Sequence, residues 1–253
     1  VANTTGTDNV AVGALSLDAN TTGSDNTAIG DNALGANTTA NSSTAVGSSA
    51  LLVSTGATNV AVGSQSLMAN TTAANNVAVG YNTLAANTTG ASNTALGGSA
   101  LSANTTAADN TAVGYLSLAA NTTGASNVAV GKSAMAVNTT GADSVAIGYN
   151  ALTANTTATK NTAVGYQAGD ALTTGAQNTI LGYNALSAAT TVASQTAVGY
   201  NALNASTTGT DNTAIGTHTL SLNTTGDSNA ALGYGALAAN TTADNNTAVG
   251  YNS

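Results

Sequence analysis

The sequence predicts an all-β fold, a parallel β-solenoid or β-roll of about fifteen coils, on three observations. A unit of 17 residues repeats along the chain, each unit ends on an aliphatic residue followed by Gly, and the composition is rich in Thr, Val and Asn. Seventeen is not a whole number of 3.6-residue turns, and these residues are poor helix formers, which argues against helical repeats. A short repeat rich in β-branched residues suits one coil of a solenoid whose neighbours stack about 4.8 Å apart.

The marker of each unit is a Gly that follows an aliphatic residue, and we number the unit from this Gly as position one. Every spacing is 17 residues except the 16 between Gly47 and Gly63, where the usual Ala-Asn-Thr-Thr is shortened to Val-Ser-Thr. We therefore expect residues 1–253 to form a single continuous array with one short unit at 47–62. Because the chain begins at Val1 instead of Met, we also expect it to be a processed product or a piece of a longer protein.

Two positions of the unit carry large apolar side chains. Position seventeen is always aliphatic, and position five is almost always Leu or Met, with Gly169 as the exception. In stacked coils, equivalent residues lie above one another, so we expect two vertical ladders that form the core. Representative members are Val113, Val130, Ile147 and Val164 at position seventeen and Leu118, Leu152 and Leu186 at position five.

Position fourteen is usually Asn, as at Asn93, Asn161 and Asn178. Asn side chains stacked at one place in successive coils can hydrogen-bond to their copies above and below, as in cross-β structures. The Asn-Thr-Thr-Gly segment between the apolar positions is typical of a turn, because Gly tolerates positive φ and Asn and Thr bond the local backbone. The same Asn-Thr-Thr matches the acceptor pattern for N-glycosylation, but the turn role accounts for it without a glycan.

Strand alternation places positions fifteen, seventeen and two on one face and positions fourteen, sixteen and one on the other. Neither face is strongly charged, and a thin solenoid can cover only its inner face. Each coil has about two large aliphatic residues, worth roughly 2 kcal/mol each on burial, against an ordering cost of roughly 1.5 kcal/mol per residue. We therefore expect the second face to meet another chain.

The composition excludes several classes of partner and chemistry. With two Lys and Arg residues in total and a net charge of −8, the chain lacks the basic surface that nucleic acid or an anionic membrane requires. No apolar run approaches the roughly 18 residues of a membrane-spanning helix. The absence of Cys removes disulfides and thiolate chemistry, and we expect no cofactor.

No catalytic or metal-binding constellation is present in the sequence. His218 is the only His, and no second His, Cys or Glu accompanies it, so we interpret it as a surface substitution at a position usually held by Asn or Ser. The many Ser and Thr residues have no base to activate them as nucleophiles. The Asp residues lack the spacing of calcium-binding β-rolls.

All eight Tyr residues fall at position two of the unit. Tyr suits interfaces because it combines an apolar ring with a polar tip. We expect the stripe to cover a corner or to seal a subunit contact, and the alternative is a ligand-binding or carbohydrate-stacking surface. The stripe consists of Tyr81, Tyr115, Tyr149, Tyr166, Tyr183, Tyr200, Tyr234 and Tyr251.

Two segments carry a resemblance to a known family. Ser-Val-Ala-Ile-Gly-Tyr-Asn-Ala-Leu at 144–152 and Asn-Thr-Ala-Val-Gly-Tyr-Gln-Ala-Gly at 161–169 resemble the YadA-like head repeats of trimeric autotransporter adhesins. The longer pattern Asn-Thr-Ala-Val-Gly-Tyr-Asn-Ala-Leu-x-x-Asn-Thr-Thr-Gly-x-x-Asn is similar to repeats of phage tail-fibre and bacterial surface proteins. The resemblance implies a left-handed parallel β-roll in each chain and three chains in one rod, although the family's repeats are usually shorter. It also implies binding to host matrix or self-association, with no single residue as the binding site.

We therefore expect a non-enzymatic structural rod, a homotrimer, in a surface adhesin or viral tail fibre. Its location would be extracellular, on a cell or virion, with copies of itself and a host-surface protein or glycan as partners. One alternative is a self-assembling extracellular filament, since the open ends of a stacked β-rod template further stacking. A second is an ice-binding solenoid, although the adjacent Thr residues of Asn-Thr-Thr would point to opposite sides.

Overall fold

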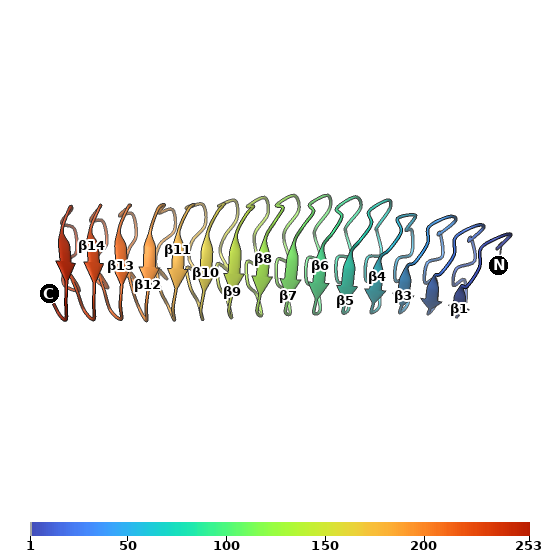
Figure 1. Cartoon of the computed structure of the whole chain (residues 1–253), viewed down its shortest axis with the longest axis horizontal. Coiled ribbons are helices and arrows are strands. Elements are labelled where there is room, and N and C mark those ends of the chain that lie inside the picture. The colour runs from blue at the N-terminus through green and yellow to red at the C-terminus, as the bar shows by residue number, and fades with distance from the viewer. Residues whose placement is uncertain (1) are drawn as a thin grey trace. The chain divides into compact units, whose positions relative to one another are not determined.

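The computed structural model describes residues 2–253, and every regular element in this range is a β-strand of three residues (Figure 1). The chain forms two compact units, Val1–Ser126 and Asn127–Ser253. The first unit contains β1 (Val10–Val12), β2 (Thr27–Ile29), β3 (Thr44–Val46), β4 (Val60–Val62), β5 (Val77–Val79), β6 (Thr94–Leu96) and β7 (Thr111–Val113). The second contains β8 (Val128–Val130), β9 (Val145–Ile147), β10 (Thr162–Val164), β11 (Thr179–Leu181), β12 (Thr196–Val198), β13 (Thr213–Ile215), β14 (Ala230–Leu232) and β15 (Thr247–Val249). Within 2–253, no helix is long and apolar enough to cross a membrane.

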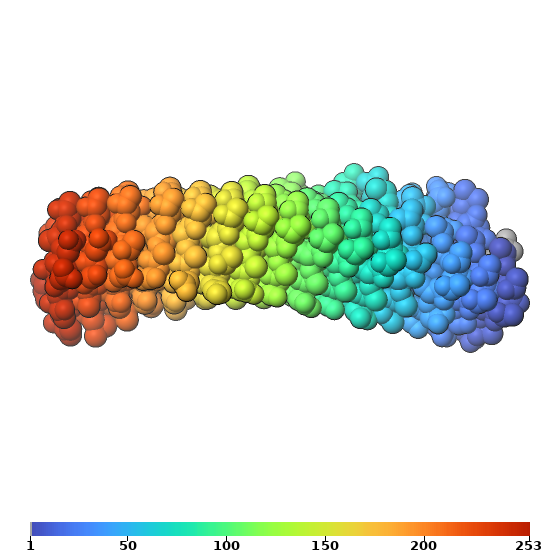
Figure 2. All heavy atoms as spheres, turned by 90° about the horizontal axis from the view of Figure 1, so that it is seen from above, coloured from blue at the N-terminus to red at the C-terminus, as the bar shows by residue number. Residues whose placement is uncertain are grey.

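Within each unit, every strand pairs in parallel with the strand of the next coil. The pairing joins equivalent positions, so that Thr162 lies opposite Thr179 and Val164 lies opposite Leu181. The short repeat keeps this register, because Thr44 of β3 pairs with Val60 of β4 across 16 residues. Neighbouring coils pack directly on one another on the face shown in Figure 2. The predicted all-β parallel solenoid is confirmed, with about 14 turns and 15 strands in the described chain.

The Gly at position one is required where each strand ends. Gly165 has a φ of 142°, a backbone conformation that side chains rarely adopt. A Cβ atom on Gly165 would also lie 2.3 Å from the carbonyl oxygen of Gly182 in the next coil. Both the backbone angle and the close approach of the coils therefore exclude larger residues, which explains why the marker Gly recurs in every unit.

The corners of the coil depend on left-handed residues that are not Gly. Position three (Asn150, φ 55°), position five (Leu152, φ 50°) and position thirteen (Asp143, φ 57°) adopt this conformation. Asn and Asp tolerate it, whereas Leu does so at a cost of about 1–2 kcal/mol. Full burial of a Leu side chain contributes about 1.5–3 kcal/mol, which offsets this strain. The Leu at position five therefore turns the chain and fills the interior at once.

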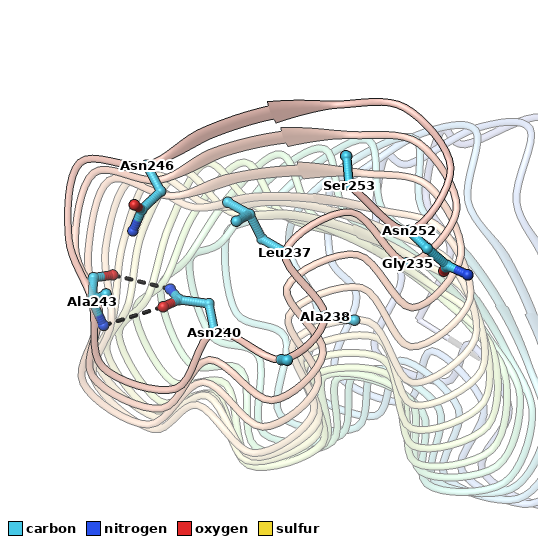
Figure 3. A pocket seen from close by; sticks show the side chains of 9 residues that line it. Gly235, Leu237, Ala238, Asn240, Ala243, Asn246, Asn252 and Ser253 are labelled. Carbon is cyan, nitrogen blue, oxygen red and sulfur yellow. Dashed lines mark hydrogen bonds between the residues drawn. The ribbon is translucent and has the colours of Figure 1, made fainter.

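The interior of a typical coil is lined by Leu at position five, Ala at position sixteen and Asn at positions eight and fourteen. Leu152, Leu186 and Ala163 are all 0% exposed. The end-on view of the last coil shows Leu237, Asn240 and Asn246 pointing inward (Figure 3). The predicted ladder at position five therefore lies in the core.

The ladder at position seventeen does not lie in the core, so that part of the prediction was wrong. Val113, Val130, Ile147 and Val164 occupy equivalent places on successive coils, but they point outward, and Ile147 is 39% exposed. Ala146 beside it is fully buried. The inner face of the strand accepts only the small Ala because the Leu of position five already fills the space behind it.

The coil at 165–181 is an exception that demonstrates how positions five and sixteen pack together. Here Gly169 replaces Leu at position five, and Ile180 replaces Ala at position sixteen. A Cβ on Gly169 would lie 2.7 Å from the Cδ1 atom of Ile180, so the larger residue occupies the space that the Leu vacates. Positions five and sixteen therefore share one interior volume.

A matched pair of substitutions on β5 tests which position faces inward. Ala78→Leu places a large side chain in the filled interior, and we expect a loss of about 1–3 kcal/mol in the free energy of unfolding. Val79→Leu puts the same residue on the outer face, where Leu96 and Leu181 occur naturally. We expect it to change stability by less than about 0.5 kcal/mol in urea titrations followed by circular dichroism. Equal losses for both variants would contradict the assignment of the faces.

Candidate interaction surface

The outer face of the strands is an apolar surface that the chain itself does not cover. We call the side chains at positions fifteen and seventeen the outer sheet face. No residue at positions fifteen and seventeen is charged. Leu96, Leu181 and Leu232 remain 47–48% exposed. A shallow apolar hollow lies over β13 to β15, where Ala230 replaces the Thr or Val of other coils. Contiguous exposed apolar surface is typical of interaction sites.

Tyrosine rings at position two form a stacked row along the second unit. Tyr149, Tyr166, Tyr183 and Tyr200 stack in sequence with centroid distances of 5.2, 4.9 and 5.5 Å and interplanar angles of 7–18°. The rings cover one another's faces, so their edges and hydroxyl groups are left toward solvent. This arrangement disfavours the carbohydrate-stacking alternative, because a sugar ring packs on an open aromatic face.

His218 fills a gap in this row. Its coil has Thr217 at position two, and the imidazole makes edge contacts with Tyr200 and Tyr234 at 5.3 and 6.2 Å between centroids. It is half-buried and has no metal-binding neighbours, since no group of three or more His, Cys, Asp or Glu residues within 2–253 is placed to hold an ion. Sequence reasoning placed His218 on the surface but missed its aromatic partners, because it lies one residue after the tyrosine position.

The row continues at both ends of this set. Tyr234 stacks on Tyr251 at 5.2 Å, and the Nζ atom of Lys132 lies 5.7 Å from the ring centroid of Tyr149. In the first unit, Tyr81 and Tyr115 are separated by the coil of Gly98, and a Cβ there would lie 3.5 Å from the Tyr115 ring. A continuous aromatic row is therefore a feature of the second unit. We call its members from Tyr149 to Tyr251, His218 included, the tyrosine row.

Two ladders of buried Asn side chains hold the coils in register beneath this surface. At position fourteen, Asn161 Oδ1 accepts hydrogen bonds from the backbone N–H of Asn178 at 2.9 Å and from its Nδ2 at 3.1 Å. Asn93 Nδ2 donates to the carbonyl oxygen of Ala107 in the next coil at 2.9 Å. These Asn side chains, predicted to stack as a ladder, form hydrogen bonds both to each other and to the backbone of the neighbouring coil.

The second ladder, at position eight, was not predicted. Asn104 Nδ2 donates to Asn87 Oδ1 at 2.9 Å, and Asn87 Nδ2 donates to Asn70 Oδ1 at 3.1 Å and to the turn carbonyl of Gly90 at 2.9 Å. This Asn begins the Asn-Thr-Thr turn. Its recurrence at the same spacing as the Asn of position fourteen was the sequence signal that could have predicted a second ladder. All three side chains are fully buried, so these glycosylation acceptors are out of reach in the folded protein.

The position-eight ladder is interrupted within the second unit. Leu172, Ala189 and Ser206 take the place of Asn in three successive coils. Buried oxygen atoms without a hydrogen-bond partner gather here, among them Asp170 Oδ1, Gln195 Oε1 and Ser206 Oγ. Burial raises the pKa of Asp170, partly countered by backbone N–H groups of Asp170 and Ala171. The region is a local fault in the core and holds no base and nucleophile pair.

The hollow at the last coil is lined by the same interior residues, including Leu237, Asn240 and Asn246 (Figure 3). Asn240 exchanges two hydrogen bonds with the backbone of Ala243, at 3.0 and 3.2 Å. In other coils these positions are covered by the following coil, so the hollow belongs to the solenoid interior and is no separate ligand site.

Comparison with known proteins does not assign the chain to a family. A scan against protein-family models found no match, and a search of curated proteins found none either.

Removal of one ladder Asn tests its contribution. Asn87→Ala deprives Asn104 Nδ2 and Asn70 Oδ1 of their partner, and we expect a loss of about 1–3 kcal/mol in the free energy of unfolding. Thr89→Ala, at an exposed position of the same turn, should stay within about 0.5 kcal/mol of the parent. Urea titration of both variants measures this, and an Asn87→Ala chain as stable as the control would show that the ladder is dispensable.

Asp170 predicts a pH dependence whose sign follows from its raised pKa. The folded chain keeps the carboxyl proton of Asp170 at a pH where the unfolded chain has lost it. The stability that this group contributes is therefore complete below its ordinary pKa of 3.8 and is lost as the pH rises above that value. Asp170→Asn should therefore melt at a higher temperature than the parent near neutral pH, and the difference should disappear below 3.8. Asp143→Asn, which removes the same charge at an exposed corner, is the control. A gain that is independent of pH would contradict this origin.

Proposed function

We propose that this chain is a non-enzymatic structural protein whose outer sheet face associates with further copies of itself, forming a homotrimeric rod of a surface adhesin or viral tail fibre. One observation carries the proposal. Every coil places an aliphatic residue at position seventeen although it contributes little to that coil's interior, with exposures such as 47% for Leu181. A residue that is apolar in every coil and exposed in the single chain is best explained by a partner that covers it.

The energetics support self-association. Burial of the exposed half of each such side chain contributes on the order of 1 kcal/mol, and each copy supplies one per coil. Over the seven or eight strands of one unit, two copies together gain enough to offset the roughly 4–15 kcal/mol lost in translational and rotational freedom. Weak contacts repeated at every coil add in this way, because the second and later ones form without a new association event.

The trimeric state and the extracellular location rest on the resemblance of residues 144–152 and 161–169 to YadA-like head repeats. In that arrangement, each of three chains turns one face toward its neighbours and leaves the Asn-Thr-Thr corners outside. Identical coils would set the length and stiffness of the rod and present the same small surface many times. A host-surface protein or glycan would then bind through many weak contacts.

Ice binding is a second candidate because of the outer sheet face itself. Strands such as β3, β7 and β10 place a Thr and a Val outward from parallel, evenly spaced ranks. Val replaces Thr in this rank at β1, β4, β5, β8 and β9, and Ala replaces it at β14. A solitary chain would leave this face to water, whereas an associated one would bury it.

The native mass in solution tests the proposal. We expect about three times 24.0 kDa by sedimentation, constant over a wide range of concentration. Masses that grow with concentration would indicate a self-assembling filament instead of a trimer. A stable monomer would overturn self-association, and ice-recrystallisation assays would then test the second candidate.

A matched pair of double variants locates the interface. Ile147→Lys with Leu181→Lys places two charges on the outer sheet face, and we expect dissociation to 24.0 kDa with an unchanged circular dichroism spectrum. Thr140→Lys with Thr174→Lys adds the same charges at exposed turns of the same two coils, and we expect this control to keep the parent mass. Dissociation of the control alone would place the interface at the turns.

A further inference from the structure

The tyrosine row is not required to form the coil. Ser64 follows Gly63, which has a φ of 130°, and Tyr166 follows Gly165, which has a φ of 142°. The strands that lead into these two turns have the same length and the same parallel pairing. Because Ser and Tyr are interchangeable for the fold at position two, the unbroken row in the second unit points to a property of the rings themselves.

The geometry of the row brings phenol rings of adjacent coils into direct contact. The closest pair, Tyr166 and Tyr183, has its centroids 4.9 Å apart and its planes within 7° of parallel. Because the coils pair in register and the two ring planes are nearly parallel, each phenol face, with the ring carbons next to its hydroxyl-bearing carbon, is turned toward the neighbouring ring. Exposures of 41–47% from Tyr149 to Tyr200 leave the hydroxyl edge open to solvent and give the rings room to rotate.

We propose that the tyrosine row is a site of oxidative cross-linking, in which dityrosine bonds join adjacent coils of one chain. The oxidant is of the class that a haem peroxidase forms with hydrogen peroxide. It removes one electron from each of two phenols, and each hydroxyl proton leaves to water. The two phenoxyl radicals join through a new carbon–carbon bond between ortho carbons, and the hydrogen on each of these carbons moves to the oxygen. Two tyrosines and one peroxide thus give one dityrosine and two waters.

The row selects which pairs can couple. Four pairs are stacked in adjacent coils, namely Tyr149 with Tyr166, Tyr166 with Tyr183, Tyr183 with Tyr200, and Tyr234 with Tyr251. The imidazole of His218 lies between Tyr200 and Tyr234 and cannot form the bond. Tyr81 and Tyr115 are kept apart by the coil of Gly98. Each bond would tie one coil covalently to the next, in a chain that has no Cys to do so.

The experiment treats the full chain with a haem peroxidase and hydrogen peroxide and maps the products by mass spectrometry. Trypsin cuts after Lys160, which puts Tyr149 and Tyr166 on different peptides, and an Asp-specific protease separates Tyr234 from Tyr251 at Asp244. We expect these peptides to be joined with the loss of two hydrogen atoms per bond. On a denaturing gel, the product should keep the mobility of one chain.

Paired variants make the test specific. Tyr166→Phe with Tyr200→Phe keeps the aromatic stack but removes the phenol partners of Tyr149 and Tyr183, so dityrosine fluorescence should fall to that of the Tyr234–Tyr251 pair. Tyr81→Phe with Tyr115→Phe removes the same number of phenols outside the row and should leave the yield unchanged. Equal losses in the two variants, products that join separate chains, or no coupling while free tyrosine amide in the same solution dimerises would each overturn the proposal.

These outcomes are independent of the oligomeric state, because a bond within one chain is recognised on the denaturing gel whether or not copies associate. A monomeric protein would therefore refute the homotrimer and leave the cross-linking site standing.

Discussion

The in-register stacking of equivalent residues is the constraint on which the rest of this structure depends. Backbone groups of the strands and corners bond to the neighbouring coil, as the N–H of Leu152 does to the carbonyl oxygen of Ala168, so every unit must have the same path. The short unit at 47–62 shows how strictly this holds. Its missing residue is taken from the turn, and Ser54 replaces the buried Asn of position eight. Ser54 Oγ still accepts from Asn70 Nδ2 at 3.0 Å and donates to the carbonyl of Gly56 at 3.3 Å, so the short unit keeps its link to the following coil.

This constraint gives the two faces of each strand different roles. The interior is narrow, so Ala at position sixteen and one Leu at position five fill it, and Asn amides satisfy the buried turn carbonyls. Unpaired buried carbonyls would cost about 1–3 kcal/mol each, which explains polar side chains in so thin a core. The larger aliphatic residues are left for the outer face, where the single chain cannot cover them. The same geometry that builds the coil thus produces the surface that a partner must bury.

The sequence predicted the period, the parallel pairing, the Leu ladder and a stack of Asn at position fourteen, because each follows from spacing alone. It could not decide which strand face is inside, since alternation defines two faces and ranks neither. Residue size carried that answer: Ile180 occurs at position sixteen in the coil where Gly169 vacates position five. The position-eight ladder was missed because Asn before Thr-Thr also suits an exposed turn, and only the close approach of successive turns buries it. The contacts of His218 were missed because the ring reaches back from the neighbouring position.

The fault in the inner ladder and the tyrosine row lie in the same part of the second unit. Leu172, Ala189 and Ser206 remove amide hydrogen bonds from coils whose outer edge carries Tyr166, Tyr183 and Tyr200. A stacked aromatic pair contributes about 0.5–1.5 kcal/mol beyond its buried area, which equals the net value of a typical hydrogen bond. The outer stack can therefore offset what the inner ladder loses in these coils. Compensation explains only part of the row, however, because Tyr149 and Tyr234 lie in coils that keep Asn at position eight. Because more coils carry stacked rings than lack the inner Asn, the rings need a further role at the surface.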